Sequence, residues 1–325
     1  MKLSVIIPAY NTAEYLRECV DSVKICDGVE IILVDDGSSD GVTPSLCDEL
    51  ASERSDIKAV HSPNKGLGGA RNLGLTYACG DYVLFLDSDD LIADGAVDAL
   101  LEATEHGDDV IAFGFFVRNG NTDTAYTPNI CLPNGRFSVR SNPECLLSLP
   151  SAWSRAWKRS FLIASEITFP EKLRYEDLAT VPALLAAAKT IYPLQKELYI
   201  YRIRRGSIMS DSSPQKNKDV LAAFDLLLSS FDRLGLTEAY KNELERLAVD
   251  HILIAASVRV LSGREKSARE AVRKLVRYVD LHFPTLEKNP HLKSLSFKHR
   301  LVFLLVRNDH IRLAQFCIRI HNLIS

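Results

Sequence analysis

The sequence has no long apolar run and no paired-cysteine motif. No stretch reaches about 18 uninterrupted apolar residues, and the early run from Val5 to Ile7 ends at Pro8. We therefore expect neither a signal peptide nor a membrane-spanning helix. The seven cysteines are odd in number and include no Cys-x-x-Cys pair. This argues against a zinc site or a disulfide framework and favours reduced thiols in the cytoplasm.

The chain also lacks a strong charge of either sign. Its formal net charge of −3 over 325 residues gives no support to a nucleic-acid partner bound through overall charge. Charged residues make up 25% and hydrophobic residues 46%, as in an ordinary soluble globular protein. The length suits one large domain or a domain with a substantial extension.

Strand and helix patterns alternate through the first hundred residues. This alternation predicts an α/β fold with a mainly parallel sheet that helices cover on both faces, and ligands bind such sheets at the carboxyl ends of the strands. From Asn119 to Pro143 the pattern changes to loops or a hairpin, and from Pro214 onward almost every segment is helical. We expect a boundary near residue 212, with a catalytic domain at 1–212 and a helical region at 213–325. The expected strands are 3–10, 57–61, 82–86 and an apolar run that starts at Val29 and ends in acid and turn residues. The expected helices are 12–24, 44–54, 69–78, 143–149, 178–189, 219–234, 238–261 and 265–282.

The ends of three predicted strands carry polar clusters: 8–11, 35–38 and 87–90. The cluster Asp87-Ser88-Asp89-Asp90 has two interpretations. It is either a solvated turn in which Asp90 or Ser88 caps the next helix, or a site for Mg²⁺ or Mn²⁺ shared with a phosphate-bearing ligand. A calcium loop of the EF-hand type is excluded, because glycine at the sixth position and glutamate at the twelfth are missing.

Six segments together resemble a known family. They are "SVIIPAYN", "VDDGSSDG", "NKGLGGARNLG", "GDYVLFLDSDD", "RYEDL" at 174–178 and "YRIRRGSIM" at 201–209. In this order and spacing they resemble the inverting, nucleotide-sugar-dependent glycosyltransferases of family 2, of the bacterial surface-polysaccharide type. The resemblance covers roughly the first 210 residues and implies a Rossmann-like GT-A fold with a helical C-terminal extension. The C-terminal third matches no motif.

The resemblance also implies the residues of a site for a UDP-sugar. Asp89 would bind Mn²⁺ or Mg²⁺ directly, with Asp87 nearer the ribose or sugar, and which of Asp35 and Asp36 faces the base stays open. Arg202 and Ser207 match a loop that closes over the diphosphate, although Arg204 or Arg205 could point inward instead. The nucleotide-sugar set is Pro8, Tyr10, Asn11, Asp35, Asp36, Asn64, Arg71, Asp87, Ser88, Arg202 and Ser207.

The "ED" pair supplies the predicted catalytic residues. By motif match, Asp177 is the base that takes the proton of the acceptor hydroxyl, and Glu176 orients the base or the acceptor. Without the family, this pair is an ordinary helix N-terminus with favourable acids. Relatives carry Trp followed by Asn and Lys where this chain has Trp153, Ser154 and Arg155. Trp153 and Trp157 are either core residues or an aromatic platform under the acceptor sugar.

The tail from His291 to Ser325 is basic and amphipathic. It contains six Lys or Arg residues against Asp309 alone, a local charge of +5, with apolar residues between them. Such a segment favours a peripheral contact with anionic lipid headgroups, or a helix docked on the enzyme with its basic face in water. These two interpretations are equally consistent with the sequence.

These observations together predict a metal-dependent inverting glycosyltransferase. It would transfer a hexose or an N-acetylhexosamine from a UDP-sugar to a saccharide acceptor, lipid-linked, for a capsule or similar cell-surface polysaccharide, at the inner face of the membrane. Two alternatives stay open: a non-catalytic nucleotide-sugar-binding protein, and another nucleotide-dependent α/β transferase.

Overall fold

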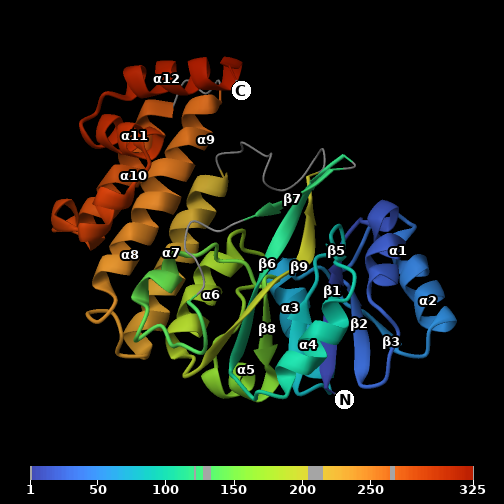
Figure 1. The fold of residues 1–325 in the computed structure, drawn as a ribbon. Helices are drawn as coiled ribbons and strands as arrows, with labels where there is room; N and C mark the ends of the chain where they lie inside the picture. The colour runs from blue at the N-terminus through green and yellow to red at the C-terminus, as the bar shows by residue number, and fades with distance from the viewer. Residues whose placement is uncertain (1, 121, 127–132, 204–214, 264–267, 325) are drawn as a thin grey trace. The chain divides into compact units, whose positions relative to one another are not determined.

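The computed structural model describes residues 2–120, 122–126, 133–203, 215–263 and 268–324. The chain divides into two compact units, Met1–Ser207 and Ile208–Ser325 (Figure 1). The boundary that we expected near residue 212 falls among residues 204–214, which lie outside the described residues.

The first unit is built on one nine-stranded sheet. Its main order is β3-β2-β1-β4-β8-β6-β9-β5, and β7 pairs with β6. Strands β1 to β4 pair in parallel, as the alternation predicted, and β6 pairs in parallel with β9. Strands β5, β7 and β8 join their neighbours in antiparallel fashion. The strands are β1 Leu3–Ala9, β2 Val29–Asp35, β3 Ile57–His61, β4 Tyr82–Phe85, β5 Leu91–Ile92, β6 Val110–Asn119, β7 Thr122–Tyr126, β8 Arg155–Lys158 and β9 Ile191–Arg202.

Helices cover both faces of this sheet (Figure 1). One core contains alternate residues of β1, namely Leu3, Val5 and Ile7, together with apolar residues of α1, α2 and α4. On the other face, α3 lies so close that a Cβ added to Gly74 would stand 2.4 Å from a methyl carbon of Ile6. The helices of this unit are α1 Ala13–Ser22, α2 Thr43–Glu53, α3 Gly66–Tyr77, α4 Ala96–Thr104, the 3₁₀ turn η1 Pro143–Leu147, α5 Arg159–Ser165 and α6 Glu176–Ala187.

The second unit is helical in its described residues. A buried cluster joins α9 and α10 to α11 and α12 through Leu261, Val272, Val306, Ala314 and Ile318. No helix in the described part of the chain is long and apolar enough to cross a membrane. The elements are α7 Gln215–Arg233, α8 Lys241–Ala248, the π-helical η3 Val249–Ala256, α9 Ser257–Ser262, α10 Ala268–His282, the 3₁₀ turns η4 Leu286–Lys288 and η5 Pro290–Ser294, α11 Phe297–Arg307 and α12 Ile311–Ile324.

Candidate active site

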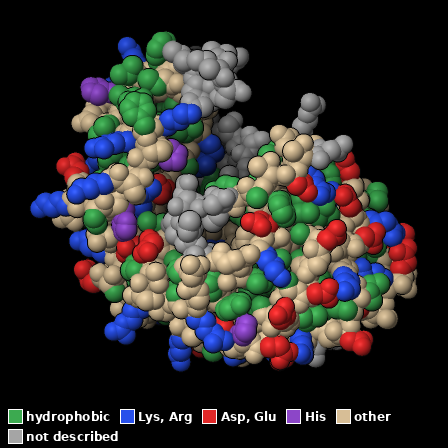
Figure 2. Space-filling model, viewed as in Figure 1, with side chains coloured by type: hydrophobic (Ala, Val, Ile, Leu, Met, Phe, Trp, Pro, Cys, Tyr) green, Lys and Arg blue, Asp and Glu red, His purple; other side chains and the backbone are tan. Residues whose placement is uncertain are grey.

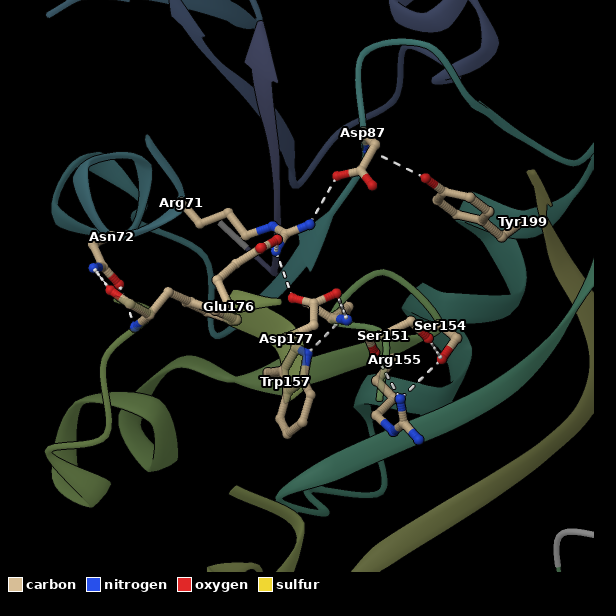
Figure 3. Close-up of polar contacts among 12 residues, drawn as sticks. Arg71, Asn72, Asp87, Ser151, Ser154, Arg155, Trp157, Glu176, Asp177 and Tyr199 are labelled. Atoms are coloured by element: carbon tan, nitrogen blue, oxygen red, sulfur yellow. Dashed lines mark hydrogen bonds and ion pairs between the residues drawn. The ribbon is translucent and has the colours of Figure 1, made fainter. Parts of the chain in front are cut away.

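Arg71, on α3, joins three carboxylates at the centre of the first unit. Its Nη2 donates to Asp87 Oδ1 at 2.9 Å, and its Nη1 donates to Glu176 Oε1 at 3.0 Å and to Asp177 Oδ1 at 2.5 Å (Figure 3). The guanidinium is almost fully buried, with 1% of the side chain exposed. The acid at the end of the fourth strand and the distant "ED" pair therefore share one cation.

Glycines on α3 let the segment before α6 come this close. A Cβ on Gly68 would lie 2.4 Å from the carbonyl oxygen of Pro170, and Gly66 has a φ of +76° beside Lys172. Asn72 fixes the same approach, because its Nδ2 donates to the carbonyl of Phe169 at 2.7 Å and its Oδ1 accepts from the N–H of Phe169 at 3.1 Å. The glycine-rich motif thus makes room for the chain's own residues and brings Glu176 and Asp177 to Arg71.

Burial shifts the ionisation of these groups. It raises the pKa of Glu176 to about 7, with Asp177 adding to the effect and Arg71 opposing it. Burial likewise raises the pKa of Asp87 to about 6, against the opposing charge of Arg71. The pKa of Arg71 is raised because the charges of Asp177, Asp87 and Glu176 outweigh the effect of its own burial. The three carboxylates therefore share one guanidinium, whose single positive charge does not balance their three negative charges.

The rest of the acidic strand end is held by β9. Tyr199 donates its hydroxyl to Asp90 Oδ2 at 2.7 Å and accepts the N–H of Asp87 at 3.2 Å. The N–H of Arg202 donates to Asp90 Oδ1 at 2.8 Å, and its Nε donates to the carbonyl of Asp89 at 2.6 Å. Burial raises the pKa of Asp90 to about 8.

Neither residue expected to cap the next helix does so. Helix α4 begins at Ala96, with Gly95 at the N-cap position. The acidic turn instead folds inward, because Asp90 is bound by β9 and the hydroxyl of Ser88 lies 3.0 Å from that of Thr12. The helix-cap prediction for Asp90 and Ser88 was therefore wrong.

The two acids that end β2 and begin the next turn have different surroundings. Asp35 Oδ1 accepts the N–H of Ser38 at 3.0 Å, and Oδ2 lies 3.0 Å from His61 Nδ1. Asp36 Oδ1 accepts the N–H of Lys65 at 2.7 Å, just before α3 begins. Burial raises the pKa of Asp36 despite this bond. Both oxygens of Asp35 are thus bound within the chain.

The remaining residues predicted to bind the nucleotide sugar, apart from Ser207, belong to the end of β1 and to the loop before α3. Tyr10 is 47% exposed, directly after β1, whereas Pro8 is buried within that strand. Asn11 has a φ of 52°, and its Oδ1 accepts the N–H of Ser39 at 2.8 Å, so it ties the β1 end to the β2 end. Asn64 is exposed in the turn before α3. Ser207 lies outside the described residues.

Comparisons with known proteins indicate the class of enzyme. The model of the family described as Glycosyl transferase family 2 matches residues 4–161. The chain is 28% identical to glycosyltransferase GlyG of Streptococcus pneumoniae, over 75% of this chain and 89% of that protein. It is 27% identical to the uncharacterized glycosyltransferase EpsJ of Bacillus subtilis, over 93% of this chain and 94% of that one. The chain is a glycosyltransferase whose residues 4–161 match family 2.

A solved structure supports the fold of this glycosyltransferase along its whole length. The structure of Staphylococcus aureus TarS 1–349 in complex with UDP-GlcNAc covers 100% of this chain and 93% of its own, at a TM-score of 0.72 and 22% identity. TarS is named a poly(ribitol-phosphate) β-N-acetylglucosaminyltransferase. The predicted GT-A fold and enzyme class are confirmed.

The donor atoms of the acidic turn fit a hard divalent cation. Asp87 keeps 21% of its side chain exposed and Asp89 is half-buried, and carboxylate oxygens are the ligands that Mg²⁺ and Mn²⁺ prefer. Within the described residues, no group of three or more His, Cys, Asp or Glu side chains could hold a metal by itself. The fit is thus to a cation that shares Asp87 and Asp89 with phosphate oxygens.

Both tryptophans are buried in the core of this glycosyltransferase. Trp157 is fully buried, and its Nε1 donates to the carbonyl of Ala152 at 3.0 Å, so it is a core residue and not an acceptor platform. Trp153 is 7% exposed and stacks on Tyr199 with ring centroids 4.4 Å apart. The platform interpretation therefore fails for Trp157.

Sequence reasoning missed three groups at this site. Tyr199 connects Asp87 to Asp90, His61 lies between Asp35 and Asp48, and the N–H of Ala152 donates to Asp177 Oδ2 at 3.0 Å. The apolar run around Tyr199 indicates a buried strand, but it does not show that the hydroxyl reaches Asp87 and Asp90. A backbone amide such as that of Ala152 leaves no mark in the sequence.

Proposed function

We propose that this enzyme transfers one sugar from a UDP-sugar to a saccharide acceptor with inversion at the anomeric carbon, and that the reaction needs Mn²⁺ or Mg²⁺. The observation that carries the proposal is the single guanidinium of Arg71 between Asp87 and the pair Glu176 and Asp177. This guanidinium brings the acid of the donor side close to a candidate base for the acceptor, so both groups needed for a one-step displacement lie in one site.

The donor would lie along the carboxyl ends of β1, β2 and β4. The exposed ring of Tyr10 suits stacking against uracil, and a carboxylate suits the imide proton of uracil. We assign that contact to Asp36, because both oxygens of Asp35 are bound by Ser38 and His61. Pro8, Asn11, Asn64, Ser88, Arg202 and Ser207 would complete the nucleotide-sugar site.

Asp89, with Asp87 beside it, would hold the cation. When bound, the cation would offset the negative charge that develops on the departing diphosphate. Arg71 favours the ionised form of Asp87, against the effect of burial. Arg202 lies close to this turn through its bond to the Asp89 carbonyl, and its fork geometry suits phosphate oxygens.

Asp177 would act as the general base. The acceptor hydroxyl gives its proton to Asp177 while its oxygen forms a bond to the anomeric carbon. The bond between that carbon and the diphosphate oxygen breaks, and UDP leaves with the electron pair. Arg71 and the Ala152 N–H bind the two oxygens of Asp177 and hold the carboxylate in one orientation.

The acceptor would be part of a cell-surface polysaccharide, as the poly(ribitol-phosphate) in the name of TarS suggests, and it would be lipid-linked. Helices α11 and α12 bury one apolar side in the second unit but leave Phe297 82% and Phe316 61% exposed. Lys and Arg side chains lie among hydrophobic ones on this unit (Figure 2). We propose that these helices contact anionic lipid at the inner face of the membrane.

UDP release tests the proposed reaction. Purified enzyme would be screened against UDP-glucose, UDP-galactose and their N-acetyl forms, with Mn²⁺ and saccharide acceptors. Release that requires both the metal and an acceptor supports the proposal. UDP binding without release under all conditions would indicate a non-catalytic nucleotide-sugar-binding protein, and release from a nucleotide that carries no sugar would indicate a different transferase.

A further inference from the structure

Arg155 carries a positive charge into the protein core. It begins β8 and is 5% exposed, and burial lowers the pKa of its guanidinium to about 10. Within the described residues, each of its hydrogen-bond acceptors is a neutral oxygen. Its Nε makes no hydrogen bond there and is buried. A buried cation without a paired acid is costly, so it calls for an explanation.

Within the described residues, the side-chain hydrogen bonds of Arg155 all end in the segment just before it. Nη1 donates to the carbonyl of Ser151 at 2.6 Å and to the hydroxyl of Ser154 at 3.0 Å (Figure 3). Nη2 donates to the hydroxyl of Ser148 at 2.8 Å. The guanidinium thus gathers residues 148–154 into one turn around itself.

The peptide groups on both sides of Ala152 are held within this turn. Arg155 binds the carbonyl of Ser151, which belongs to the same peptide group as the N–H of Ala152, and Trp157 Nε1 donates to the carbonyl of Ala152. The Ala152 N–H in turn donates to Asp177 Oδ2 at 3.0 Å. Arg155 therefore fixes the peptide group whose N–H donates a hydrogen bond to the carboxylate of Asp177.

The charge of Arg155 also interacts favourably with the carboxylate of Asp177. Among the acids around Arg155, Asp177 exerts the largest opposing effect on the guanidinium. Arg71 contacts the other oxygen of Asp177. The carboxylate thus lies between a cation in contact and a second cation behind the 148–154 turn.

We propose that residues 148–157 form a support for the catalytic carboxylate, in which Arg155 fixes the peptide whose N–H holds Asp177 in the orientation needed for transfer. Arg155 is a positioning residue that acts through Asp177, and the inference rests on the proposed role of Asp177 as the base. Ser154 belongs to the same support, because its hydroxyl accepts a hydrogen bond from Arg155 Nη1. The pair would thus serve as one unit.

Amide hydrogen exchange on the full chain, resolved to single residues and without substrate, tests the support itself. In wild type the Ala152 amide should exchange slowly, and in Arg155→Met its exchange should rise about tenfold or more. Arg155→Lys should give an intermediate rate. Arg136→Met, at a half-exposed surface arginine, is the matched control and should leave Ala152 unchanged. Wild-type exchange at Ala152 in Arg155→Met would overturn the proposal.

Kinetics test the consequence for catalysis. With the UDP-sugar that wild type turns over, Arg155→Met should lower kcat about ten- to hundred-fold and leave the donor KM within about twofold, and Arg155→Lys should restore part of kcat. A rise in donor KM with unchanged kcat would contradict the positioning role. If wild type turned over no UDP-sugar, the proposed function would fail, while hydrogen exchange would still decide whether Arg155 holds Ala152.

Discussion

Arg71 donates to Asp177 at 2.5 Å although 106 positions separate them in the chain. The same guanidinium contacts Asp87, so the ends of two distant motifs are coupled through one buried group. A change in the charge of one acid must therefore change the electrostatic potential at the other. This coupling underlies the predictions that follow.

Removing Arg71 should destabilise the protein strongly. In Arg71→Met, three carboxylates remain close together without their common cation, and breaking such a buried pair costs about 3–5 kcal/mol in unfolding free energy. Urea denaturation at neutral pH measures this loss. Arg17→Met is the control, since Arg17 pairs with Glu49 and Glu53 on the exposed surface and should change stability little. Equal effects of the two substitutions would contradict the network.

Glu176 should make stability depend on pH. Its folded pKa, raised to about 7 by burial, lies above that of an unfolded glutamate, so the folded state holds a proton that the unfolded state releases. The free energy of unfolding that Glu176 contributes is therefore present below about pH 4.5 and is lost as the pH rises toward about 7. Urea denaturation of wild type and Glu176→Gln across this range measures the effect. The difference between wild type and variant should decrease as pH rises, and a constant difference would refute the shift.

Asp177→Asn should abolish transfer while it leaves donor binding intact. The amide keeps the shape of the side chain but cannot take the acceptor proton, so kcat should fall by about 10²–10⁴-fold. Calorimetry with UDP and Mn²⁺ should give a dissociation constant close to that of wild type. A variant that retains most of its kcat would show that another group is the base.

The exposed apolar side of α11 and α12 should bind anionic vesicles. Phe297→Asp combined with Phe316→Asp should weaken cosedimentation with phosphatidylglycerol-containing vesicles about tenfold, because both rings are more than half exposed and would enter the lipid. Ile163→Asp, on the exposed side of α5, is the control and should bind as wild type does. Vesicles of phosphatidylcholine alone should bind weakly. Unchanged binding by the double variant would exclude this surface.

The sequence predicted the parallel strands β1 to β4 well, since each is a short apolar run with a helix pattern after it. The strand β3 at Ile57–His61 was predicted with its observed bounds. The antiparallel β8 was not predicted, because a strand of only four residues shows no clear alternation in the sequence. Nor does a single sequence show whether such a strand pairs in parallel or antiparallel fashion. Pairing of β6 with β9 joins residues about eighty positions apart, and local periodicity contains no information on such contacts.

The candidate site was predictable as a set of residues but not as a network. Motif resemblance led to Asp87, Glu176 and Asp177, which the structure brings to one guanidinium. Arg71 was expected to line the sugar and diphosphate side, and the structure shows that its guanidinium is buried among these acids. Burial of that kind depends on how α3 and α6 pack, which a single sequence does not reveal.

The most direct measurement is the thermal stability of wild type and Asp89→Ala with UDP, with Mn²⁺, and with both. The account predicts that both ligands together raise the Tm of wild type more than either does alone, and that Asp89→Ala loses this gain. Asp94→Ala, at an exposed acid five positions further on, should retain it. No shift of wild type with UDP and Mn²⁺ together, or an equal shift in Asp89→Ala, would contradict a metal-assisted UDP-sugar site at this strand end.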